Sequence, residues 1–141
     1  MNSNSFISWV LRSRAHGLLS GGMMLITVTG RKTGRQITTP VQYLPEGDVL
    51  WVISSRDRTW WRNLRGGAQV TLRLRGKDVR GRAEVLEEAQ AVEKGFQVYF
   101  HLAPKSAKFC NVKLDAAGNP QADDIAALSQ KRLLIQICPG G

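Results

Sequence analysis

Residue types that commonly carry chemistry are scarce in this chain of 141 residues. It has only two cysteines, Cys110 and Cys138, and shows no secretory signal, so we expect reduced thiols in the cytoplasm. Its two histidines, His16 and His101, lie far apart and lack a cysteine or carboxylate at metal-ligand spacing. No run approaches the ~18 apolar residues of a membrane span. These absences argue against a disulfide scaffold, a metal site and a membrane-spanning protein.

The usual signatures of catalysis by protein side chains are missing too. The chain has no Gly-x-Ser-x-Gly elbow, and no Walker or dinucleotide-binding glycine pattern stands between a strand and a helix. Hydrolysis by a protein nucleophile or by a bound metal is therefore not expected. If the chain is an enzyme, a bound cofactor carries the reaction.

Acidic residues are few relative to basic ones. Eleven Asp and Glu residues stand against 20 Lys and Arg residues, which gives a net charge of +9. Such an excess indicates an anionic partner: nucleic acid, an acidic membrane surface, or a small ligand with phosphate or carboxylate groups. The charge by itself does not choose among the three. The apolar share of 43% is that of a folded globular protein, and the length suits one core.

The order of apolar residues and turn residues predicts a mainly β fold. Strands are expected over residues 23–29, 37–44, 49–54, 70–74, 79–86 and 133–138. Helices are expected over residues 5–19, 60–64, 87–101 and 123–129, with Asp123 as the cap of the last. Successive hairpins favour an antiparallel meander of about six strands that closes into a barrel. We therefore expect an N-terminal helix over residues 1–22 and a barrel domain over residues 23–141.

A strongly basic hairpin turn is the clearest local feature. Gly30 and Gly34 bracket Arg31, Lys32 and Thr33, and glycine permits backbone angles that expose successive N–H groups. These donors, a guanidinium group and a hydroxyl group together suit a phosphate. The return strand adds two threonine hydroxyls. The alternative is a solvated hairpin tip that is kept polar against aggregation.

A second cluster begins at the end of the third predicted strand. Two serines and an arginine at 54–56 are followed by Trp60, Trp61 and Asn63. Tryptophan is costly to expose, so such a pair usually places one ring in the core and the other at a surface, ligand or partner. Asn63 could hydrogen-bond the edge of a heteroaromatic ring. The alternative is a core tryptophan, with Asn63 capping backbone groups.

Together and in this order, these residues resemble the deazaflavin-dependent nitroreductase family, whose members use coenzyme F-420 on a flavin-reductase-like split β-barrel. The resemblance runs over residues 25–85 and is carried by four short segments, at 27–34, 38–41, 52–56 and 60–64. It implies a split barrel for the fold and hydride transfer for the activity. The implied cofactor is coenzyme F-420, with FMN as the second choice.

The resemblance also implies which residues hold the cofactor. The basic turn corresponds to the phosphate-binding segment, the next strand segment lies along the cofactor, and the two later segments enclose its ring and tail. The implied cofactor-binding residues are Arg31, Lys32, Thr33, Thr38, Thr39, Pro40, Val41, Ser54, Ser55, Arg56, Trp60, Asn63 and Leu64. The resemblance identifies no catalytic residue, and Tyr99 is the nearest counterpart of the tyrosines that lie beside the substrate in that family.

The function that we expect is hydride transfer from reduced coenzyme F-420 to a quinone, a nitro compound or an activated alkene. The alternative is a non-catalytic binder of a flavin, haem or lipid on the same barrel. Nucleic-acid binding is disfavoured because the strand basic residues face outward with few interleaved aromatics. Those residues are Arg73, Arg75, Lys77, Arg80 and Arg82. We further expect a homodimer, and the N-terminal helix permits peripheral membrane contact.

Overall fold

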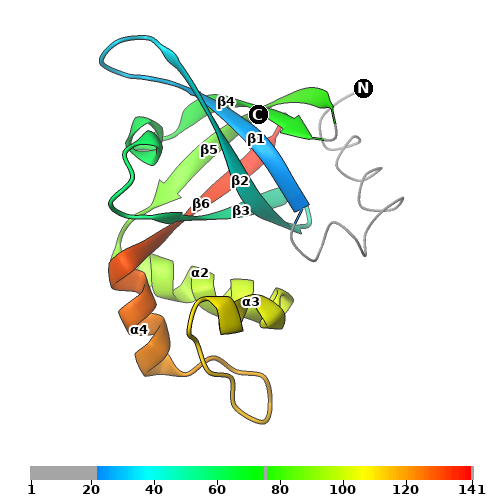
Figure 1. Ribbon diagram of the computed structural model, residues 1–141, viewed down its shortest axis with the longest axis vertical. Helices are drawn as coiled ribbons and strands as arrows, with labels where there is room; N and C mark the ends of the chain where they lie inside the picture. The colour runs from blue at the N-terminus through cyan, green and yellow to red at the C-terminus, as the bar shows by residue number, and fades with distance from the viewer. Residues whose placement is uncertain (1–21, 75, 141) are drawn as a thin grey trace.

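Six antiparallel strands close into a barrel in the computed structural model, which describes residues 22–74 and 76–140 (Figure 1). The strands are β1 (Gly22–Thr29), β2 (Gln36–Glu46), β3 (Val49–Ser55), β4 (Ala68–Leu74), β5 (Lys77–Leu86) and β6 (Arg132–Pro139). The predicted mainly β fold, a closed antiparallel barrel, is thus confirmed. The predicted N-terminal helix lies outside the described residues, except for Gly22, which is the first residue of β1.

The strands follow one another around the barrel in the order β1, β2, β3, β6, β5, β4, and β4 pairs with β1 to close it. The predicted meander is therefore wrong at one point, because β3 pairs with β6 rather than with β4. Both strands are apolar along most of their length, and their pairing sets Val52 opposite Ile135, which are both fully buried. A strand that is buried on both faces is favoured in the interior of the fold, with a paired strand on each side. After β3 the chain passes through the short 3-10 helix η1 (Trp60–Leu64) and then re-enters the barrel as β4.

Alternate residues of the strands fill the barrel interior, as the pleat of a strand requires. On β4, Val70, Leu72 and Leu74 are buried, whereas Arg73 between them is exposed. β1, β5 and the other strands add further apolar side chains to the same core, which continues under the helices as one cluster. The interior is therefore packed with side chains, and any ligand site has to lie outside it.

In the described part of the chain, α2 (Ala89–Leu102), α3 (Pro104–Phe109) and α4 (Ala122–Lys131) lie together at one end of the barrel (Figure 1). Helix α2 buries Phe96 and Phe100, whose ring centroids lie 5.6 Å apart in a stacked arrangement. Gly95 allows α2 to approach the barrel closely, because a Cβ at this position would press on Leu134 of β6 and Trp51 of β3. This close packing holds α2 against β3 and β6.

The helices predicted after β3, after β5 and before β6 are all present. The sequence does not predict α3, because a proline such as Pro104 usually indicates the end of a helix. Helix α2 does end just before Pro104, at Leu102, but the same proline then occupies the first turn of α3. Proline is favoured at this position because the first N–H groups of a helix have no partner inside it.

The predicted cap of α4 is wrong. The helix begins at Ala122, so Asp123 lies in its first turn, and Gln121 occupies the cap position without a side-chain hydrogen bond. Acidic groups in a first turn are still favourable, because they face the positive end of the helix dipole. Asp124, next to it, accepts a hydrogen bond from the backbone N–H of Lys113 at 2.9 Å and so holds the preceding loop.

Candidate functional site

The basic turn between β1 and β2 projects from the end of the barrel that faces away from the helices (Figure 1). The N–H of Gly34 donates to the carbonyl of Gly30 at 2.8 Å, which closes the turn. Gly34 has a φ of 72°, a left-handed conformation that favours glycine. The side chains of Arg31, Lys32 and Thr33 are all exposed. The turn thus presents two cationic groups on a backbone of defined shape.

Asn63 joins this turn to helix η1. The backbone N–H of Arg31 donates to Oδ1 of Asn63 at 3.0 Å, and Nδ2 of Asn63 donates to the carbonyl of Trp60 at 3.0 Å. The amide of Asn63 therefore holds backbone groups, which is the alternative that the sequence leaves open for it. Two motifs that lie about thirty residues apart in sequence, the basic turn and the tryptophan helix, form one connected unit.

A cavity of about 550 Å³ lies between strands β2 and β3 and helices α2 and α3. This volume is within the range of roughly 300–1,000 Å³ that is typical of small-molecule sites. Five residues predicted to hold a cofactor line it: Pro40, Val41, Ser54, Ser55 and Trp60. The structure thus brings the middle of β2, the end of β3 and the start of η1 to one concave surface.

Several lining residues have no motif in the sequence that marks them. Arg58 and Arg132 line the cavity, as do Ser106 and Cys110 at the α3 side, together with Tyr99 of α2. The cavity-lining residues include no Asp or Glu, so the described wall carries positive charge only. Such a concave surface attracts anionic ligands.

Arg58 is held in place by β2. Its Nη2 donates to Oγ1 of Thr39 at 3.2 Å, and Thr39 is itself buried with a relative exposure of 7%. Thr39 therefore positions a cationic lining residue although it does not line the cavity itself. Thr38, the neighbouring predicted residue, shares a hydrogen bond of 2.8 Å with the hydroxyl of Thr27 on β1. Leu64, the last residue of η1, is fully buried in the core.

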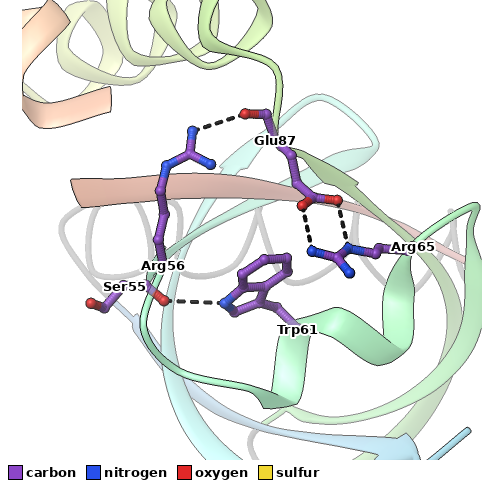
Figure 2. Close-up of polar contacts among 5 residues, drawn as sticks. All are labelled: Ser55, Arg56, Trp61, Arg65 and Glu87. Atoms are coloured by element: carbon purple, nitrogen blue, oxygen red, sulfur yellow. Dashed lines mark hydrogen bonds and ion pairs between the residues drawn. The ribbon is translucent and has the colours of Figure 1, made fainter. Parts of the chain in front are cut away.

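Arg56 is bound to two backbone carbonyls, of which Figure 2 shows that of Glu87. Its Nε donates to the carbonyl of Ser129 at 2.8 Å, and its Nη2 donates to the carbonyl of Glu87 at 2.9 Å. It is not one of the residues that line the cavity. These bonds tie the loop after β3 to the segment that precedes α2 and to the last turn of α4.

Trp61 braces the same loop from the other side (Figure 2). Its indole N–H donates to the carbonyl of Ser55 at 3.2 Å. The guanidinium of Arg65 lies 5.2 Å from the centroid of the Trp61 ring and pairs with both carboxylate oxygens of Glu87, at 3.0 and 2.9 Å. The position of Ser55, and with it one wall of the cavity, is thus set by contacts that a ligand would not have to supply.

Trp60 carries a polar atom that no other residue described in the structure satisfies. The Nε1 atom of its indole is buried, and it has no hydrogen-bond partner among the described residues. A buried donor without an acceptor costs roughly 1–3 kcal/mol, so such atoms call for an explanation. Because Trp60 also lines the cavity, its indole is a candidate for contact with a bound ring.

The titratable groups on the helix side of the cavity keep their protons at neutral pH. Burial raises the pKa of Tyr99 to about 12. Burial also raises the pKa of the Cys110 thiol, an effect that the positive charge of Arg132 partly opposes. Neither group is therefore an ionised nucleophile or base.

Within residues 22–74 and 76–140, no group of three His, Cys, Asp or Glu side chains could hold a metal ion. Every helix in those ranges is too short or too polar to cross a bilayer.

Solved structures with the same fold include flavin-binding proteins and an F-420 enzyme. The general stress FMN/FAD binding protein from Xanthomonas citri has 15% identity and a TM-score of 0.55, with 99% of this chain and 84% of that chain covered. A FAD-binding protein from Mesorhizobium loti has 13% identity and a TM-score of 0.55, with coverage of 92% and 89%. A protein named F-420 reductase has 17% identity and a TM-score of 0.50, with coverage of 88% and 90%. At these identities the likeness shows a shared fold.

Comparison with curated proteins gives no significant match. A family model gives one: the model described as F-420H(2)-dependent quinone reductase matches residues 11–109, which is more than half of the chain. The match includes the basic turn, the cavity-lining parts of β2 and β3, and helix η1. The chain belongs to the F-420H(2)-dependent quinone reductase family, and it is accordingly a deazaflavin-dependent oxidoreductase.

Proposed function

We propose that this protein transfers a hydride from reduced coenzyme F-420 to a quinone, a nitro compound or an activated alkene, with the reacting groups of both molecules held in the cavity between β2, β3 and the helices. One observation carries the proposal. The cavity joins apolar side chains, those of Pro40, Val41 and Trp60, to cationic groups, and no carboxylate is among the residues that line it. This combination suits a planar ring that carries an anionic tail.

The described residues fit the cofactor in shape and in charge. Coenzyme F-420 has a flat deazaflavin ring, a phosphodiester and an oligoglutamate tail, so a positively charged groove with one apolar wall is appropriate. The indole N–H of Trp60, which has no acceptor within residues 22–74 and 76–140, provides a donor that a ring heteroatom would satisfy. When bound in its reduced form, this cofactor supplies the hydride, and the acceptor takes up the hydride and one proton.

In this proposal each part of the chain has a separate role. Pro40 and Val41 support the ring. The hydroxyls of Ser54 and Ser55 donate to the carbonyl of Ser55 and to the carboxylate of Asp57, so their oxygens accept hydrogen bonds from the polar edge of the ring. The basic turn binds the phosphodiester through Arg31, Lys32 and Thr33, and Arg58 adds a cation between the turn and the ring. Asn63, Thr39 and Arg56 position these groups through the hydrogen bonds described above. Thr38 holds β2 to β1 through its hydrogen bond with Thr27, and the buried side chain of Leu64 anchors η1.

The proton for the acceptor comes from solvent. A general acid works best when its pKa lies near the operating pH. Tyr99 has a pKa of about 12 and would release its proton far less readily than water exchanges protons through an open cavity. Its hydroxyl remains a hydrogen-bond donor at neutral pH. Tyr99 therefore orients an acceptor oxygen and stabilises charge that develops there.

Cofactor titration tests the proposal directly. Oxidised coenzyme F-420 and FMN are titrated separately, and ligand fluorescence is followed. We expect saturable binding of coenzyme F-420 and oxidation of its reduced form when a quinone is added. Arg58→Gln should weaken coenzyme F-420 binding about tenfold, while the surface variant Arg80→Gln should stay within about twofold. No saturable binding of either cofactor would overturn the oxidoreductase assignment of this cavity.

The same titration tests the alternatives that concern the ligand. Binding of FMN, haem or a lipid without acceptor reduction would favour the non-catalytic binder. We also propose a cytoplasmic homodimer whose N-terminal segment contacts membranes peripherally. Sedimentation of the full chain, and its flotation with vesicles of anionic lipid, test these two points.

A further inference from the structure

One cation of the cavity is left without a role in holding the cofactor. Arg132 is the first residue of β6 and pairs in register with Ser55 at the end of β3. It lines the cavity next to Cys110, and its charge affects the pKa of that thiol. Within the described part of the chain, the ion pairs involve Arg65, Arg73 and Arg82, so Arg132 has no carboxylate partner there.

The other cations of the site gather at a different end. Arg58 is tied to β2 through Thr39, and the basic turn lies beyond η1, away from the helices (Figure 1). Arg132 instead stands at the junction of α4 and β6, on the side of the cavity that α3 covers. Arg132 thus lines the cavity on the Cys110 side, whereas the side chain of Arg58 is held by Thr39 of β2.

We propose that the acceptor reduced in this cavity carries a carboxylate, and that Arg132 binds this carboxylate at the α3 side. This inference rests on the proposed function, because it names the class of the second substrate: carboxylated quinones or α,β-unsaturated acids. A planar guanidinium matches the two oxygens of a carboxylate and can bind both of them at once. The cation also stabilises the negative charge that an acceptor gains with the hydride.

The ligand-binding test uses a matched pair and needs no cofactor. Naphthoquinone and a carboxylated naphthoquinone are titrated into the full chain, and quenching of tryptophan fluorescence is followed. We expect the carboxylated ligand to bind at least about tenfold more tightly. Arg132→Gln should remove the preference, and Arg132→Lys should keep part of it because the charge remains without the planar fork. Arg80→Gln, which removes one exposed charge from β5, should leave the preference intact.

Three results would overturn the inference. One is equal affinity of the wild-type chain for the two quinones. Another is a preference that survives in Arg132→Gln. The third comes from the cofactor itself. Coenzyme F-420 and its ring portion without phosphate and glutamates are titrated into the same variant. If Arg132→Gln weakens only the complete cofactor, Arg132 holds the cofactor tail and the inference is wrong. Failure of the proposed function shows differently, as absence of coenzyme F-420 binding by a chain that still prefers the carboxylated quinone.

Discussion

Replacement of Asn63 by alanine separates the basic turn from helix η1. Asn63→Ala removes the acceptor for the N–H of Arg31 and the donor to the carbonyl of Trp60, both at 3.0 Å in the wild-type chain. The bond to Trp60 is partly buried, whereas the bond to Arg31 is exposed, so water replaces the second more easily than the first. The change thus removes the link between the turn and η1, and it deletes none of the side chains that we propose to bind the ligand directly.

The structure sets the size of both expected effects. A hydrogen bond contributes roughly 0.5–1.5 kcal/mol net, and the exposed bond lies at the low end of that range. We therefore expect the free energy of unfolding to fall by about 1–2 kcal/mol. Fixing the backbone of one residue costs about 1–2 kcal/mol, and the freed turn has to meet that cost when the phosphate binds. The dissociation constant for coenzyme F-420 should rise about tenfold.

Urea unfolding measures the first effect and fluorescence titration measures the second. Gln90→Ala is the matched control, because Gln90 is an exposed amide side chain on α2, far from the turn in sequence, and should change neither value. The ring portion of the cofactor, without its phosphate, should bind Asn63→Ala as tightly as the wild-type chain. An unchanged affinity for complete coenzyme F-420, in a variant that is destabilised as expected, would refute the idea that Asn63 positions a phosphate-binding turn.

Four further changes test other parts of the account. Arg56→Met should lower the free energy of unfolding by about 2–4 kcal/mol in urea, because two hydrogen bonds from a charged group are lost. Gly95→Ala should destabilise the protein by about 1–3 kcal/mol in the same assay, since the new methyl presses on Leu134 and Trp51. The double variant Arg31→Gln/Lys32→Gln should weaken coenzyme F-420 binding and reduce its dependence on salt in titrations at several ionic strengths. Tyr99 has a pKa of about 12 in the folded chain and about 10 when unfolded. The unfolded chain therefore loses this proton first, and unfolding free energy should fall by about 2–3 kcal/mol as the pH rises through that interval. Tyr99→Phe should remove this part of the alkaline loss.

The two arginines of the cavity have different surroundings, which explains why their roles can be separated. Arg58 is bound to a buried threonine of β2, so its direction is set before a ligand arrives. Arg132 lies near the half-buried thiol of Cys110 instead. A site with two such cations can hold two anionic ligands together, which a hydride transfer between them requires.

Local sequence patterns were sufficient for most of the elements. The alternation of apolar residues predicts the strands, and the glycines at 30 and 34 predict the turn that the structure contains. These features follow from the neighbours of each residue, since side-chain alternation and backbone angles are local properties. The motif resemblance added the family and the barrel, and the family model confirms that membership.

The composition of the site depended on contacts that local patterns do not encode. Arg132 and Tyr99 reach the cavity only because β6 pairs with β3 and α2 packs across the barrel end. Arg56 and Asn63 have the residue types of ligand-binding groups, yet the fold provides them with carbonyl and N–H partners from distant segments. Sequence alone thus determined which segments form strands, turns and short helices. Tertiary structure decided which polar side chains face the cavity and which stabilise its walls, because that choice depends on where segments far apart in the chain meet.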